Sequence, residues 1–174
     1  TVKARRDRLR QTGVLRDAGE AAPSGGRRPS RVAFEPRARF SGAIDSGASH
    51  ASVALTDLSG TILRTAPVTV DLSAPGDTAI TTAARALGAL LRDGDPELAA
   101  VGVGIPGPVE HALGRPVAPP LLPHWHNLDI PATIHAELPA PALVDNDANL
   151  LAPATEAPDG LHSFAQTLHA LRHP

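Results

Sequence analysis

The chain has 174 residues, a formal net charge of −2, and neither cysteine nor methionine. Without cysteine it can build no disulfide framework and no thiolate zinc site, and no apolar run approaches the roughly 18 residues that a transmembrane helix needs. We therefore expect a cytoplasmic protein without a membrane partner. Because translation starts at methionine and this sequence starts at Thr1, we also expect it to be a fragment of a longer protein.

The charges are distributed unevenly along the chain. Residues 1–40 carry 11 Lys and Arg against 4 Asp and Glu, whereas residues 41–174 carry 5 against 14. A basic first segment joined to an acidic remainder suggests a nucleic-acid-binding arm on a separate body. A solvated basic tail is the alternative interpretation.

The first segment predicts a helix followed by two short strands. Residues 1–12 are expected to be helical, because Val2 and Leu9 lie seven positions apart and cationic residues cover most of the remaining surface. Gly13 is suited to end this helix. A strand, a turn-rich basic loop and a second strand are then expected at residues 14–16, 17–30 and 31–34.

From Ala43 onward the pattern is that of an α/β domain. Apolar runs predict strands at residues 43–47, 50–55, 61–64, 101–105 and 142–144. Helical periodicity predicts helices at residues 76–92 and 129–138, with an irregular proline-rich loop at residues 111–127. This order, which begins with an antiparallel meander, is compatible with the first lobe of a ribonuclease H-like domain, as in sugar kinases and actin-like ATPases. Residues 153–174 are left unassigned.

Four motifs follow one another in this α/β region. They are I-D-S-G-A-S-H-A-S-V-A-L-T-D-L-S-G from Ile44, V-G-V-G-I-P-G-P-V from Val101, L-P-H-W-H-N-L from Leu122 and V-D-N-D-A-N from Val144. In this order they resemble the first phosphate motif, the Gly-rich loop, the Leu-Pro-x-Trp segment and the Asn-Asp-x-Asn block of the ROK (repressor, open reading frame, kinase) family. The resemblance implies that residues 41–152 form the N-terminal lobe of a ROK sugar-kinase-like domain.

The first segment resembles one branch of this family. T-V-K-A-R-R-D-R-L-R-Q-T-G-V-L-R-D, from Thr1, is similar to the recognition helix and first wing strand of the winged-helix module in ROK regulators, and S-G-G-R-R-P-S-R, from Ser24, resembles their wing. The sugar kinases of the family usually lack this module. The resemblance therefore implies a partial winged helix at residues 1–36 and a regulator truncated at both ends.

A winged helix places its recognition helix in the major groove, with its first residues near base edges and flanking cations on phosphates. Arginines of a thin wing can enter a narrow minor groove. The DNA-binding residues that the resemblance implies are Thr1, Lys3, Arg5, Arg6, Arg10, Arg27 and Arg28.

In the lobe, the resemblance implies a phosphate site at the first motif. Asp45 would orient a hydrated Mg²⁺, and the loop of Gly47 and Ser49 would cradle nucleotide phosphates. Ala48 stands where the family has a second glycine, and its Cβ counts against nucleotide binding. The alternative is an ordinary strand–turn in which Asp45 is a capping residue. ATP and Mg²⁺ are thus cofactors only if the protein is a kinase.

The resemblance also implies a sugar site at the last motif. Asp147 would take a proton from a sugar hydroxyl, Asn146 would hold a neighbouring hydroxyl, and the Gly107 loop would close over the ring. The alternative is that Asp145 or Asp147 caps the following helix, and both roles are compatible. His124 and His126, two positions apart in the proline-rich loop, are interpreted as loop packing, so no metal site is predicted.

The sequence thus predicts a sugar-responsive, DNA-binding transcriptional regulator of the repressor type. Its expected partners are operator DNA, a sugar or sugar phosphate effector, and further copies of itself. Catalysis by this chain is not expected, because the second kinase lobe is missing from these residues. The alternatives are a glucokinase-like ROK sugar kinase, which phosphorylates a hexose with ATP, and a non-functional gene remnant.

Overall fold

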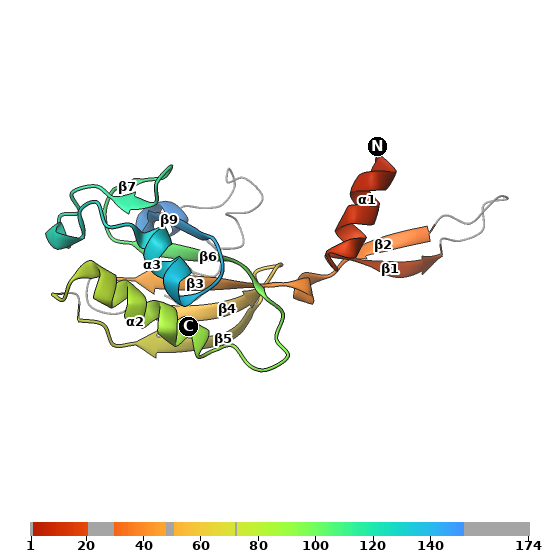
Figure 1. Ribbon diagram of the computed structural model, residues 1–174, viewed down its shortest axis with the longest axis horizontal. Helices are drawn as coiled ribbons and strands as arrows, with labels where there is room; N and C mark the ends of the chain where they lie inside the picture. Colours follow the sequence, from red (N-terminus) through yellow and green to blue (C-terminus); the bar gives the residue numbers. More distant parts are fainter. Residues whose placement is uncertain (1, 21–29, 48–50, 72, 152–174) are drawn as a thin grey trace.

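The computed structural model describes residues 2–20, 30–47, 51–71 and 73–151. They form a helix–hairpin unit at the N-terminus and a larger α/β lobe, joined by a short linker (Figure 1). Residues 153–174 lie outside the described residues. So do five residues with predicted roles: Thr1, Arg27, Arg28, Ala48 and Ser49. None of the described helices is long and apolar enough to cross a membrane.

The helix–hairpin unit consists of α1 (Val2–Gln11), β1 (Leu15–Glu20) and β2 (Ser30–Phe34). Gly13 ends the helix with a φ of +77°, a left-handed conformation that glycine adopts without steric cost. The two strands pair antiparallel, and β1 continues through a bulge after Asp17. The predicted turn at residue 17 was therefore placed too early, because pairing with β2 keeps this segment extended.

The linker is anchored to both parts of the protein. It contains the 3-10 helix η1 (Pro36–Ala38), whose first turn is capped by the Glu35 carboxylate, which accepts a hydrogen bond from the backbone N–H of Arg37 at 3.3 Å. The backbone N–H of Leu58, in the first turn of the lobe, donates to the Pro36 carbonyl at 2.9 Å. The helix–hairpin unit is thus connected to the lobe through a short, hydrogen-bonded segment.

The lobe is built on a five-stranded mixed sheet in the order β5-β4-β3-β6-β9. The first three strands are antiparallel neighbours, and β6 and β9 run parallel to β3. The predicted α/β class with an antiparallel meander is confirmed. The strand bounds are β3 (Phe40–Ser46), β4 (Ala51–Asp57), β5 (Ile62–Val68), β6 (Leu98–Ile105) and β9 (Ala142–Asn146).

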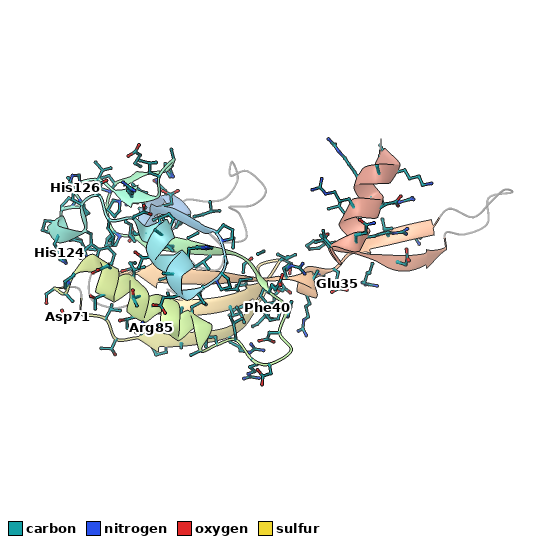
Figure 2. All side chains as sticks on the ribbon, viewed as in Figure 1. Glu35, Phe40, Asp71, Arg85, His124 and His126 are labelled. Carbon is teal, nitrogen blue, oxygen red and sulfur yellow. The ribbon has the colours of Figure 1, made fainter. Side chains whose placement is uncertain are left out.

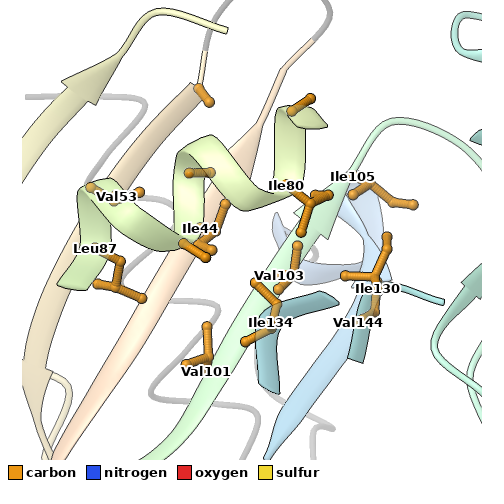
Figure 3. Close-up of a cluster of buried hydrophobic side chains, with 14 of the residues drawn as sticks. Ile44, Val53, Ile80, Leu87, Val101, Val103, Ile105, Ile130, Ile134 and Val144 are labelled. Carbon is orange, nitrogen blue, oxygen red and sulfur yellow. The ribbon is translucent and has the colours of Figure 1, made fainter. Parts of the chain in front are cut away.

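Two helices, α2 (Gly76–Gly88) and α3 (Ile130–Glu137), cover one face of this sheet (Figure 1). Ile80 and Leu87 of α2 recur at helical spacing and point toward the sheet, where they meet alternate strand residues such as Ile44 (Figure 3). The packing is tight: a Cβ at Gly42 would lie 2.5 Å from Leu87 Cδ2. The core also contains Val53, Val101, Val103, Ile105, Ile130, Ile134 and Val144.

Helix α2 ends at Gly88, four residues before the predicted end. Beyond it the chain turns, and Asp95 fixes the turn by accepting hydrogen bonds from the backbone N–H of Arg92 at 2.8 Å and from the Arg64 guanidinium of β5 at 2.5 Å. The predicted irregular loop at residues 111–127 contains short ordered elements. The remaining elements are β7 (Val109–Glu110), β8 (Arg115–Pro116), η2 (Pro123–Trp125) and α4 (Asp147–Leu151).

Candidate functional site

Two predicted motifs meet at the carboxyl ends of the parallel strands. Asp45 of β3 lies opposite Gly104 of β6, and Gly104 lies opposite Asp145 of β9. Their neighbours Ile44, Val103 and Val144 face the core, so these three residues share the opposite face of the sheet. Gly104 has no side chain, and the two aspartates are two strand spacings, or about 10 Å, apart. This arrangement places two carboxylates on the same face of the sheet at the carboxyl ends of its parallel strands.

Asn146 links the last motif to the Gly-rich loop. Its side-chain Nδ2 donates to the Gly107 carbonyl at 2.8 Å, and its Oδ1 accepts from the backbone N–H groups of Ala148 and Asn149 at 2.9 and 3.2 Å. The structure therefore brings together Asn146 and Gly107, two of the three predicted sugar-binding residues. It also gives Asn146 a second task, because its oxygen caps the start of α4.

Asp147, the third predicted sugar-binding residue and the predicted base, is the first residue of α4. Its carboxylate accepts a hydrogen bond from the backbone N–H of Ala148 at 2.8 Å. The side chain is partly exposed, on the same strand end as Asn146. Asp147 thus binds the backbone at the start of α4, and its sugar role stays a prediction.

The Gly107 loop is shaped by close packing against a proline. Gly107 has a φ of +122°, which L side chains rarely adopt. A Cβ at this position would lie 2.8 Å from Pro119 Cβ and 3.1 Å from Pro119 Cα. The loop therefore requires glycine both for its backbone conformation and for space, and its carbonyl is directed at Asn146.

Asp145 forms a polar cluster that the sequence did not single out. Its Oδ1 accepts from the backbone N–H of Asn146 at 2.6 Å and from Asn149 Nδ2 at 3.1 Å, and it lies 3.5 Å from His111 Nε2. His111 comes from the turn between β7 and β8, far from Asp145 in sequence. No spacing in the sequence indicates this contact, because it depends on how the hairpin folds over β9.

Asp129, which directly precedes α3, fixes the end of the loop that connects β8 to this helix. Its carboxylate accepts from the backbone N–H of Ala132 at 3.0 Å and from the Arg115 guanidinium of β8 at 2.6 Å. These two hydrogen bonds, the backbone bond first, lower the pKa of Asp129 below its ordinary value. The hairpin of β7 and β8 is thereby tied to the start of α3.

The predicted phosphate site is described in part. Asp45 is buried, with 3% of its surface exposed, and Gly47 follows directly after β3. The rest of the cradle, including Ser49, lies outside the described residues. Within residues 2–20, 30–47, 51–71 and 73–151, no group of three His, Asp or Glu side chains is placed to hold a metal ion. The predicted role of Asp45 in orienting a hydrated Mg²⁺ stays a prediction.

The basic residues of α1 fall into two sets. Lys3, Arg5 and Arg8 are exposed, and nitrogen-tipped side chains project from this helix (Figure 2). Arg10 is partly buried and pairs with Asp17 of β1, and Arg6 is partly buried beside Asp7 at 3.5 Å. Arg8, which the sequence analysis did not include among the DNA-binding residues, is therefore as available to a ligand as Lys3 and Arg5.

Comparison with known proteins places this geometry in a family. The model of the ROK family matches residues 41–168. The chain is 26% identical over 151 residues to the xylose repressor of Bacillus spizizenii and 24% identical over 151 residues to that of Bacillus subtilis. Each alignment covers 86% of this chain and 39% of the repressor, so the chain spans about 39% of the length of these relatives.

Solved structures show the same fold. A ROK family transcriptional regulator, a homolog of the E. coli MLC protein, matches with a TM-score of 0.63 at 18% identity, over 88% of this chain and 39% of that chain. The ROK hexokinase of Thermus thermophilus matches with a TM-score of 0.56 at 22% identity, over 66% and 37%. A glucokinase of Streptomyces griseus, in complex with glucose and AMPPNP, matches with a TM-score of 0.55 at 25% identity, over 66% and 35%. The chain belongs to the ROK family.

Proposed function

We propose that this chain is part of a sugar-responsive transcriptional repressor that binds operator DNA through its N-terminal helix–hairpin unit. A sugar bound at the carboxyl edge of the lobe would change the affinity for DNA. The intact protein would act as a homo-oligomer, because paired recognition helices read the repeated half-sites of an operator.

The observation that carries this proposal is how far the similarity to repressors extends. Alignments to the xylose repressors cover 86% of the chain, and the superposition on the ROK regulator covers 88%. The hexokinase and the glucokinase each cover 66%. An alignment of the lobe alone would give a coverage like that of the kinases. The larger coverage by the regulators therefore favours a protein that includes the helix–hairpin unit.

The helix–hairpin unit has the chemistry of a DNA-binding surface. Helix α1 exposes Lys3, Arg5 and Arg8, and the hairpin lies at its C-terminal end (Figure 1). Lysine and arginine on one helix neutralise phosphates and release counterions, which gives salt-dependent affinity for duplex DNA. The predicted contributions of Thr1, Arg27 and Arg28 belong to this proposal as well.

The carboxyl edge of the lobe has the chemistry of a sugar site. Asp45, Asp145 and Asp147 are hydrogen-bond acceptors gathered at the carboxyl ends of β3 and β9. Asn146 holds the Gly107 loop beside them at 2.8 Å. A polyhydroxylated ligand would be oriented by several such acceptors at once.

The test is a DNA-binding measurement with the whole chain. Duplexes selected from a random library would be titrated by fluorescence anisotropy at 50 and 200 mM salt, with and without D-xylose or D-glucose. We expect affinity that falls steeply with salt and changes when a sugar is added. Lack of binding to any duplex at low salt would refute the DNA-binding role, and binding unaffected by a panel of sugars would refute the sensing role.

A sugar kinase is the second candidate. It is favoured by Asp147, which directly follows β9, and by the likeness to the glucokinase that holds glucose and AMPPNP. In that role Asp45 would orient Mg²⁺ and Asp147 would accept the proton of the sugar hydroxyl. ATP-dependent phosphorylation of a hexose by the chain, abolished by D147N, would establish this role. Absence of sugar phosphate after prolonged incubation would exclude it for these residues.

A further inference from the structure

Two non-glycine residues of the loop between β8 and α3 have a positive φ. Ala118 has a φ of 42° and Asn127 a φ of 60°, and these are the positive values among the non-glycine residues that the structure describes. Asparagine tolerates this region, whereas for alanine it is unfavourable. Such a conformation persists only where surrounding contacts enforce it. The contacts that hold Ala118 are therefore important for the shape of the loop.

A histidine side chain holds Ala118. The Nδ1 atom of His126 accepts a hydrogen bond from the backbone N–H of Ala118 at 3.1 Å. His126 is exposed and lies in the proline-rich loop with His124 (Figure 2). Its ring can accept this bond only when Nδ1 carries no proton, since a doubly protonated imidazole has two donors and no acceptor. The bond thus requires that Nδ1 of His126 is the acceptor nitrogen of the ring.

The residue after Ala118 connects this bond to the candidate sugar loop. Pro119 packs against Gly107, at the position where a Cβ would approach to 2.8 Å. The Gly107 carbonyl in turn accepts the hydrogen bond from Asn146 at 2.8 Å. A continuous set of contacts therefore runs from His126 through Ala118 and Pro119 to Gly107 and Asn146.

The charged groups on the elements around this loop are already engaged or exposed. Arg115 of β8 pairs with Asp129 at the start of α3 at 2.6 Å, and also lies 3.4 Å from the Asn127 side-chain oxygen. Glu110 of β7 and His124 of η2 are exposed. Within the described residues, the bond recorded for the His126 ring is the one to Ala118.

We propose that His126 is a positioning residue of the Gly107 loop. The imidazole fixes Ala118 in its left-handed conformation, and this holds Pro119 against Gly107. Removal of the Nδ1 acceptor releases Ala118 and loosens the Gly107 loop. The link to sugar recognition rests on the proposed function, but the positioning itself does not.

Three variants separate the parts of this proposal. H126N keeps an acceptor, because asparagine Oδ1 takes the place of histidine Nδ1. H126L removes the acceptor. H124N changes the other exposed histidine of the loop and serves as the matched control. Each would be prepared as the whole chain, and its backbone and Asn146 side-chain amides would be followed by NMR at one fixed pH.

The main readout is hydrogen exchange of the Ala118 amide, normalised to its intrinsic rate. The Asn127 amide, which donates to the Pro116 carbonyl at 2.9 Å, is an internal reference whose acceptor none of the variants changes. We expect Ala118 exchange to be about tenfold faster in H126L than in wild type, the factor that corresponds to ~1.4 kcal/mol. H126N and H124N should stay as protected as wild type.

The second readout is the resonance of the Gly107 amide and of Asn146 Nδ2. Both should be displaced in H126L and should keep their wild-type positions in H126N and H124N. An Ala118 amide whose exchange is the same in wild type and H126L would overturn the proposal, as would Gly107 and Asn146 signals that H126L leaves unchanged. Neither readout needs a sugar, so failure of sugar binding would count against the proposed function alone.

Discussion

Truncating Asn146 to alanine should destabilise the lobe by about 2 kcal/mol. The side chain caps α4 through the N–H groups of Ala148 and Asn149, and losing such a cap costs about 1 kcal/mol. It also donates to the Gly107 carbonyl at 2.8 Å in a partly buried site, a bond that contributes about 1 kcal/mol. Alanine removes both.

Two further variants divide this loss. N146S keeps a capping oxygen, because serine and asparagine are about equally good caps, but it is too short to reach the Gly107 carbonyl. It should lose only about 1 kcal/mol. N149A removes an exposed side chain from the same helix, whose Nδ2 bonds Asp145 at 3.1 Å, and it should change stability by less than about 0.5 kcal/mol.

Urea unfolding, followed by circular dichroism, measures these differences. For an m-value of about 2 kcal/mol/M, N146A should lower the midpoint by about 1 M and N146S by about half as much. The reasoning fails if N146A is as stable as wild type. If N146S is only as stable as N146A, the helix cap contributes nothing. If N146S is as stable as wild type, the bond to Gly107 contributes nothing.

Further predictions address DNA binding, pH and the Gly107 loop. R5A should reduce the slope of the logarithm of the DNA-binding constant against the logarithm of salt concentration by about 0.9, the amount for one phosphate contact. R92A, at an exposed position in the lobe, should leave this slope unchanged. Equal slopes for the two variants would contradict the assignment of Arg5 to DNA binding. Folding lowers the pKa of Asp129, first through a backbone N–H of α3 and then through an arginine of β8. The contribution of Asp129 to the free energy of unfolding is therefore full above its unfolded pKa of about 3.9, and it is lost as the pH falls through its folded pKa. Unfolding measured from pH 5 down to pH 2 should therefore show a smaller loss of stability for D129N than for wild type, and parallel curves would refute this. G107A should lower the unfolding free energy by at least about 2 kcal/mol, because the new Cβ meets Pro119 in a backbone conformation unfavourable for alanine; an unchanged melting temperature would argue against the described loop.

The sheet and its helices could be predicted because their signals are local. Alternation placed Ile44 and Val53 on strands, and the spacing of Ile80 and Leu87 indicated a helix with one apolar face. The predicted end of α2 was wrong, because Asp95 in the following turn binds Arg64 of β5 and holds the chain in a bend. A contact between segments about 30 residues apart has no counterpart in a local pattern.

The candidate site could be predicted only as motifs. The sequence indicated that Gly107 and Asn146 matter, but the hydrogen bond between them follows from the position of the loop beside the end of β9. His111, in a turn, lies beside the distant Asp145 carboxylate, and His126, in a loop, accepts a hydrogen bond from the backbone of Ala118. Such contacts arise from packing, so neither histidine could be assigned a structural partner beforehand.

Trp125 makes the same loop observable in solution. It is the one tryptophan of a chain that contains no tyrosine. The indole is 1% exposed and packs against the start of α2, where a Cβ at Gly76 would lie 2.9 Å from Trp125 Cγ. Intrinsic fluorescence of the protein therefore comes from a single ring seated between the proline-rich loop and the helix layer. A shift of its emission reports separation of these two segments, and it gives any ligand titration or folding experiment a built-in optical probe without a label.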